Sequence, residues 1–96
     1  MLIKAGVDIS RLNREIRRAL NKASIIISNY DQEIIITSTY EGNHSAGSLH
    51  YSNDAFDFRH TGITLDDIAD ELRRFLTKGF DVVLESDHIH VEYDPD

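Results

Sequence analysis

The sequence contains no cysteine, no tryptophan and a single proline among its 96 residues. Without cysteine, the chain has no disulfide scaffold, no thiol nucleophile and no thiolate metal site. Any bound metal must therefore take its ligands from histidine, aspartate or glutamate. Hydrophobic residues make up 41% and charged residues 28%, which excludes collagen, a low-complexity linker and a wholly disordered chain.

Long hydrophobic runs are also missing, because no apolar stretch approaches the roughly 18 residues of a membrane span. The first ten residues lack the basic start and apolar stretch of a secretory signal. We therefore expect no membrane partner, and we expect the protein to be cytoplasmic on synthesis. The length fits one small domain over residues 1–96, with a modest core that a bound metal would help to stabilise.

The net charge of -7 is unevenly distributed. Residues 1–30 hold six basic and two acidic side chains, a net of +4, whereas residues 31–96 hold four basic and fifteen acidic side chains, a net of -11. No aromatic residue interleaves with the arginines of the basic third, and phosphate would repel the chain as a whole. We expect no nucleic-acid partner and interpret the basic residues as the solvated face of a helix.

Hydrophobic spacing predicts two helices. The first would be capped by Asp8 or Ser10 and would end at Asn29, and its apolar stripe is Ile9, Leu12, Ile16, Ala19, Leu20, Ala23 and Ile27. The second would be capped by Thr64 and would end by Gly79, and its stripe is Leu65, Ile68, Ala69, Leu72, Phe75 and Leu76. Both patterns are typical of helices that bury one side.

Short β-branched or alternating segments predict strands at 33–39 and 54–59, separated by a long polar loop at 41–53. Segments 81–85 and 88–93 form either a strand pair or one strand broken by a turn. The order is helix, strand, loop, strand, helix, strand, strand. It predicts an α+β fold in which two helices cover one face of a small, mainly antiparallel sheet.

The chain has five histidines: His44, His50, His60, His88 and His90. His88 and His90 share one face of a strand, while Asp57 follows His50 by seven positions across a turn. A loop histidine and a strand carboxylate can then converge with a histidine from the neighbouring strand. Two imidazoles, one carboxylate and an open fourth position make a catalytic zinc site. The alternative is that histidines on a polar loop have no such role.

Two motifs give these residues a family resemblance. Residues 42–57 (GNHSAGSLHYSNDAFD) resemble the first zinc motif, S-x-H-x-x-G-x-A-x-D, of the zinc D-Ala-D-Ala carboxypeptidases and phage endolysin peptidases. Residues 85–90 (ESDHIH) resemble the acid and H-x-H of the second motif. The hedgehog signalling domain has a similar metal site. The resemblance, which covers most of the chain, implies a peptidase M15-like protein with the hedgehog/DD-peptidase fold.

The same resemblance implies that His50, Asp57 and His90 bind zinc, with water as the fourth ligand. Asp87, three residues before the last ligand, matches the general base that takes a proton from that water. Glu85 is the rival, because in some relatives an acid further upstream has this role. On an ideal strand the Asp87 side chain faces away from that of His90. The chain must therefore bend near residue 87 if Asp87 is to act as the general base.

His44 and His88 match accessory histidines of the hedgehog-like sites, which donate to a developing oxyanion or orient a ligand. The alternative for His88 is a position at the rim. Two departures stand out: Asn53 replaces the motif's glycine, a mild change where φ is positive, and Tyr40 is followed by an acid where the carboxypeptidases often carry a carboxylate-binding arginine. Arg59 either substitutes for that arginine or pairs with a nearby acid.

The resemblance implies a zinc metallopeptidase that hydrolyses a peptide bond involving a D-amino acid in peptidoglycan. Its partner would be the peptidoglycan stem peptide, cut by a D-Ala-D-Ala carboxypeptidase or by an endolysin-type endopeptidase. The missing arginine argues against strict carboxypeptidase action. A small chain of this kind suits a phage-encoded or virion-associated protein. The alternative is a non-catalytic module of the same fold that keeps zinc for binding or for a structural role in a phage particle.

Overall fold

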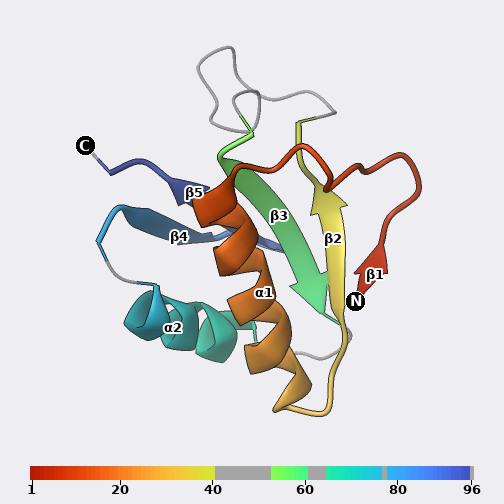
Figure 1. The fold of residues 1–96 in the computed structure, drawn as a ribbon. Helices are drawn as coiled ribbons and strands as arrows, with labels where there is room; N and C mark the ends of the chain where they lie inside the picture. The colour runs from red at the N-terminus through yellow and green to blue at the C-terminus, as the bar shows by residue number, and fades with distance from the viewer. Residues whose placement is uncertain (41–52, 61–64, 77, 96) are drawn as a thin grey trace.

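The computed structural model describes residues 1–40, 53–60, 65–76 and 78–95. Within these ranges the chain forms one five-stranded sheet and two helices (Figure 1). The elements in chain order are β1 (Leu2–Ile3), α1 (Arg14–Ser28), β2 (Ile34–Ser38), β3 (Ala55–His60), α2 (Leu65–Phe75), β4 (Phe80–Leu84) and β5 (Ile89–Tyr93). The strands lie in the order β1-β2-β3-β5-β4. The predicted α+β class is confirmed.

The sheet is mixed, which the sequence did not predict. Strands β2, β3, β5 and β4 pair antiparallel, but β1 pairs parallel with β2. β1 has only two residues, so it carries no alternating pattern from which a strand could be inferred. Segments 81–85 and 88–93 pair with each other as β4 and β5, so the alternative of one broken strand is wrong.

Helix α1 buries the predicted stripe but begins later than predicted. Its first residue is Arg14, and Asn13 rather than Asp8 or Ser10 is the residue before it. The Asp8 side chain instead accepts a hydrogen bond from the Ser10 backbone N–H at 2.8 Å, which closes a local turn ahead of the helix. The predicted end at Asn29 is confirmed, since Asn29 is the C-cap.

Helix α2 is shorter at its C-terminal end than its sequence pattern indicates. Ile68, Ala69 and Leu72 are buried, but Phe75, the last helical residue, is 52% exposed. The helix therefore ends four residues before Gly79, and the predicted cap Thr64 lies outside the described residues. None of the helices in the described part of the chain has the length and apolar character to cross a membrane.

Both helices lie on one side of the sheet (Figure 1). Helix α1 packs across β2, β3 and β5, and α2 packs against β4 and α1. Alternation along β3 sends Phe56 and Phe58 into this core, where both are fully buried. His60 is also buried and lies at the same alternating position as the two phenylalanines. The side chains between them point to the opposite side.

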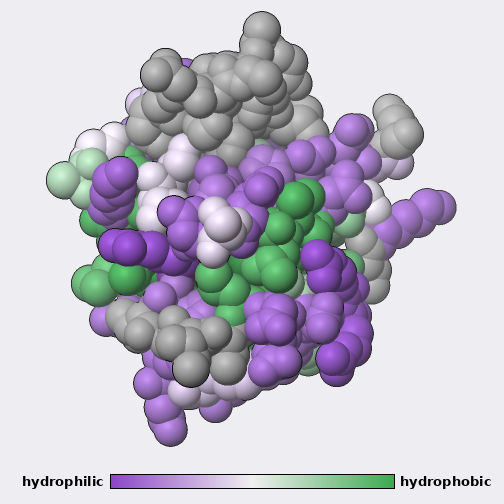
Figure 2. Space-filling model, turned by 180° about the vertical axis from the view of Figure 1, so that it is seen from behind, coloured by the Kyte–Doolittle hydropathy of each residue, from purple (hydrophilic) through white to green (hydrophobic). Residues whose placement is uncertain are grey.

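We call the side of the sheet turned away from α1 and α2 the rear face. Asp57 and Arg59 of β3 lie on it, as does His90 of β5, which stands between the buried residues Ile89 and Val91. Figure 2 shows the molecule from this side: hydrophilic side chains predominate, with a smaller hydrophobic area among them. The candidate functional residues therefore occupy a polar face of the sheet.

Candidate metal centre and active site

Asp57 and His90 form the centre of the candidate site. They are partners in the antiparallel pairing of β3 and β5 and therefore lie side by side on the rear face. Asp57 Oδ1 and His90 Nδ1 are 2.8 Å apart, and the two side chains are 13% and 16% exposed. Two residues 33 positions apart are thus held together by strand pairing in the middle of the sheet.

Glu92 holds the other side of the His90 ring. Its Oε1 atom lies 2.8 Å from His90 Nε2, so each ring nitrogen faces a carboxylate. Burial alone would lower the pKa of His90, but the hydrogen bonds to Asp57 and Glu92 outweigh it and raise the pKa above its usual value. Sequence reasoning missed Glu92, although its spacing of two from His90 puts both on one strand face.

Asp87 and His88 lie just before β5 and reach the same site. Asp87 Oδ1 is 2.8 Å from His88 Nδ1, and His88 Nε2 is 3.9 Å from Asp57 Oδ2. The chain bends at residues 86–87, as expected if Asp87 is to act as the general base. His88 then links Asp87 to Asp57. The hydrogen bond from His88 lowers the pKa of Asp87 and keeps this carboxyl ionised.

Glu85 is less closely connected to the site. Its backbone N–H donates to the His88 carbonyl at 2.9 Å, which closes the turn between β4 and β5, and its side chain is exposed. His88, by contrast, is about two-thirds buried and contacts Asp57. The geometry therefore favours Asp87 over Glu85 as the acid near the centre, and it places His88 inside the site.

The donor set suits zinc in its chemistry. An imidazole and a carboxylate are both ordinary zinc ligands. The 2.8 Å between Asp57 Oδ1 and His90 Nδ1 is a hydrogen-bond distance, so the two atoms would move apart to the roughly 3.3 Å that separates two ligand atoms of a tetrahedral zinc. Within residues 1–40, 53–60, 65–76 and 78–95, no three histidine, aspartate or glutamate side chains are arranged to hold one metal. The predicted third ligand, His50, and the accessory residue His44 lie outside the described residues.

Asn53 begins the segment that leads into the Asp57 strand. It has a φ of +65°, the left-handed conformation that glycine adopts most easily and asparagine tolerates best. This explains why asparagine can stand where the resembling motif has glycine. The Asn53 carbonyl accepts a hydrogen bond from the Asn13 backbone N–H at 3.0 Å, so the turn is tied to the start of α1.

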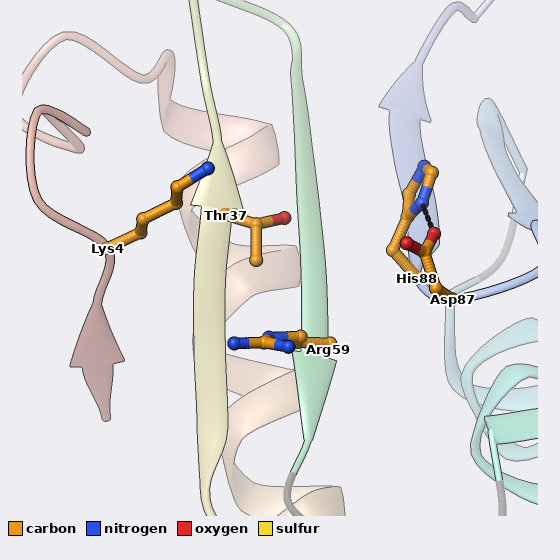
Figure 3. Close-up of a pocket in the computed structure, with 5 residues that line it drawn as sticks. All are labelled: Lys4, Thr37, Arg59, Asp87 and His88. Carbon is orange, nitrogen blue, oxygen red and sulfur yellow. Dashed lines mark hydrogen bonds and ion pairs between the residues drawn. The ribbon is translucent and has the colours of Figure 1, made fainter.

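Arg59 forms no ion pair within 4.0 Å among the described residues, but its positive charge contributes to the lowered pKa of Asp87. It lines a pocket on the rear face together with Lys4, Thr37, Asp87 and His88 (Figure 3). The pocket lies beside the Asp57–His90 pair, because His88 borders both.

A histidine and an aspartate on neighbouring strands, beside a polar pocket, fit the active site of a hydrolytic enzyme. Comparison with known protein families identifies the class of enzyme. A model of the Peptidase M15 family matches residues 2–92, which include every described residue of the site. The chain belongs to the Peptidase M15 family. This confirms the resemblance inferred from the two motifs. No curated protein matches the chain.

Proposed function

We propose that this chain is a zinc metallopeptidase that cleaves a peptide bond involving a D-amino acid in bacterial peptidoglycan. The observation that carries the proposal is the Asp57–His90 pair, 2.8 Å apart on neighbouring strands within the region that matches the peptidase family. His50 would complete the ligand set, and the fold would be of the hedgehog/DD-peptidase type. The M15 membership supports a peptidase, and the peptidoglycan stem peptide as substrate rests on the sequence motifs.

Zinc, when bound by His50, Asp57 and His90, would supply a Lewis acid that polarises a carbonyl and acidifies water. When a metal takes His90 Nδ1, Glu92 would accept the N–H that remains on Nε2, because its Oε1 atom lies 2.8 Å from that nitrogen. The same bond holds the ring in the plane that faces Asp57.

Asp87 would take the proton of the attacking water on a carboxylate oxygen and pass it to the leaving amine. Asp87 is ionised at neutral pH, which is the form a base requires, and the hydrogen bond from His88 lowers its pKa further. His88 positions Asp87 through the 2.8 Å contact, and its other nitrogen faces Asp57. Asp87 is 86% exposed, so its carboxylate is open to a bound substrate.

The direct test is digestion of purified peptidoglycan and of its stem peptides by the zinc-loaded protein, with the products weighed by mass spectrometry. We expect a new peptide fragment or free D-alanine, and we expect Asp87→Asn to suppress it. Absence of any product from wild-type protein that carries zinc would contradict the peptidase proposal. That result would favour the alternative of a zinc-containing binding or phage structural module.

A further inference from the structure

The two helices carry the most exposed apolar side chains in the part of the chain that the structure describes. Ile25 of α1 is 57% exposed and Phe75 of α2 is 52% exposed, more than any other large hydrophobic residue there. Tyr30, two residues after the end of α1, is 38% exposed. We call Ile25, Tyr30 and Phe75 the outer helical patch, which belongs to the side of the sheet opposite the rear face (Figure 1). Exposed apolar groups that gather over two neighbouring elements indicate an interaction surface.

Two contacts between the helices hold the outer helical patch in one shape. Lys22 Nζ lies 5.3 Å from the centroid of the Phe75 ring, which is a cation–π contact between α1 and α2. The Tyr30 hydroxyl donates a hydrogen bond to Glu71 Oε2 at 2.7 Å, which joins the end of α1 to the middle of α2. Ile25 follows Lys22 by one helical turn and therefore lies next to the first contact. A surface that is already ordered loses less conformational entropy when it binds a partner.

The N-terminal half of α1 makes one end of this surface positive. Arg14, Arg18 and Lys22 are exposed, and Glu15 is the one acid between residues 14 and 22. Arg17 is used within the chain, since its Nη2 atom donates to the carbonyls of residues 10 and 12. Arg18 and Glu15 lie 4.0 Å apart and are both exposed, so their ion pair contributes little. The guanidinium of Arg18 is therefore available to an external group.

The first turns of α2 make the other end of the surface negative. Asp66 and Asp67 lie in the first turn of α2 and are exposed. The hydrogen bond to Glu71 raises the pKa of Tyr30, and the negative charges of Glu71 and Asp67 raise it further, so Asp67 also lies near Tyr30. Arg74 acts on Tyr30 in the opposite sense and offsets part of this negative charge. Apolar side chains thus lie between a positive end and a negative end.

This arrangement is complementary to itself. An interface between two identical copies related by a two-fold axis brings each surface against its own copy after a rotation of 180°. Along α1, Ile25 lies about 10 Å beyond Arg18, and Tyr30 lies about 8 Å beyond Ile25. A two-fold axis near Ile25 therefore brings the positive end of one copy against the negative end of the other. Arg18 then faces Asp67 of the second copy, and the apolar side chains meet at the centre.

We propose that two copies of this chain associate through the outer helical patch, with their α1 helices antiparallel. The proposal does not depend on the proposed peptidase function, because it concerns the other side of the sheet. Both rear faces stay uncovered and point away from each other in such a dimer. The two candidate metal centres can then engage two points of one cross-linked polymer, which increases the overall affinity for it.

Sedimentation equilibrium of the zinc-loaded full chain, from about 1 µM to about 0.5 mM, tests the proposal. Two helices per copy form a small interface, so we expect a reversible change from one chain to two with a dissociation constant of roughly micromolar order. Raising the salt from about 50 mM to about 500 mM should weaken the dimer several-fold, because exposed charge pairs are screened. A protein that stays monomeric throughout this range would overturn the proposal.

Ile25→Gln and Phe75→Gln should each weaken the dimer about tenfold or more, because each removes an apolar group from the centre of the interface. Val83→Gln is the matched control and should leave the dimer unchanged. Val83 is 41% exposed, but it pairs with His90 and shares the rear face with it. Circular dichroism and melting temperature show whether the variants fold. A dimer that only Val83→Gln disrupts would place the interface on the rear face and overturn the proposal.

Reversal of charges tests the antiparallel orientation. Arg18→Glu and Asp67→Lys should each weaken the dimer, whereas the double variant should recover most of the loss, because the two positions face each other across the axis. Losses that simply add in the double variant would refute this orientation. The same patch could instead hold an anionic lipid surface. A monomeric protein that binds phosphatidylglycerol vesicles, and loses this binding in Phe75→Gln, would replace the second copy by a membrane.

Discussion

Asp57 Oδ1 and His90 Nδ1 face each other at 2.8 Å because their residues are direct partners in the pairing of β3 with β5. The contact depends on the two strands at the centre of the sheet and on no loop. Both side chains are largely buried, so their positions are constrained before any ligand arrives. This pair is the basis of the first prediction.

Zinc binding should depend on Asp57 and His90. Protein purified without added metal should carry close to one zinc per chain, and His90→Ala or Asp57→Ala should lose it, because each removes a ligand atom. Metal content is measured by plasma mass spectrometry after gel filtration. His60→Gln is the matched control, because His60 lies on the side of the sheet that faces the helices and should not affect metal content. Full metal retention by both ligand variants would refute the assignment.

Asp87→Asn should lower the rate of peptide hydrolysis by roughly 10² to 10⁴, the usual contribution of a general base, and should leave zinc content unchanged. Glu85→Gln removes a nearby exposed carboxylate and should keep a rate close to wild type. The rates are measured on the stem peptide that wild-type protein cleaves fastest. The opposite pattern, with Glu85→Gln inactive and Asp87→Asn normal, would transfer the role of base to Glu85.

Glu92 should tune zinc affinity without being a ligand. Glu92→Ala removes the acceptor for His90 Nε2 and should weaken zinc binding by about 10- to 100-fold, as measured by competition with a chelating dye. Glu92→Gln keeps an oxygen acceptor and should lose less. Asp81→Asn is the control, since Asp81 is an exposed residue paired with Glu92 on the neighbouring strand. Equal affinity in wild type and Glu92→Ala would contradict this positioning role.

Asn53 should tolerate glycine better than alanine. Its φ of +65° costs a residue with a Cβ about 1 to 2 kcal/mol, whereas glycine adopts it freely. Asn53→Ala should therefore lower the free energy of unfolding by about 1 kcal/mol, and Asn53→Gly should change it less. Urea unfolding monitored by circular dichroism gives both values. A larger loss for glycine than for alanine would show that the asparagine side chain, and not the backbone, matters here.

His60 should make the protein less stable in acid. Burial lowers the pKa of His60 below 6.5, so the unfolded chain takes up this proton before the folded chain does. The contribution of His60 is fully present above about pH 6.5 and is lost as the pH falls below it, by at most about 1.4 kcal/mol per pH unit.

The measurement compares urea unfolding of wild type and His60→Gln at pH 7.5 and 5.5. The raised pKa of His90 makes the folded chain more stable, not less, as the pH falls. Both proteins contain His90, so this contribution to stability cancels in the comparison. The variant should lose less stability on acidification than wild type. Parallel losses in the two proteins would show that His60 titrates normally in the folded chain.

Much of the fold follows from periodicity in the sequence. The stripe from Ile16 to Ile27 and the alternation around Phe56 and Phe58 are imposed by burial, and burial leaves a regular pattern. β1 was not predicted because two residues are too few to show an alternating pattern, and their partner strand, β2, is more than thirty residues away in the sequence. The start of α1 was misplaced because Asp8, Ser10 and Asn13 are all suitable caps. In the structure Asn13 is the cap, and its backbone N–H forms a tertiary hydrogen bond to the Asn53 carbonyl.

The candidate site was predictable only in part. Asp57 and His90 come from motif and strand alternation, and the structure places them side by side. Glu92 was overlooked because a single glutamate on a strand has no distinctive pattern. Lys4 was counted with the basic residues of a solvated helix, since its position beside Arg59 arises from the β1–β2 pairing.

Helix α2 and strand β4 come between β3 and β5 in the sequence, but in the sheet β3 and β5 are direct neighbours. The pairing that brings Asp57 to His90 therefore closes a long loop of chain, so the site forms late in folding. A metal held by this pair binds the folded chain and not the unfolded one, so binding and folding are thermodynamically linked. Core substitutions in α2, such as Leu72→Ala, would then weaken apparent metal affinity at a distance, and metal depletion would expose the chain to proteolysis.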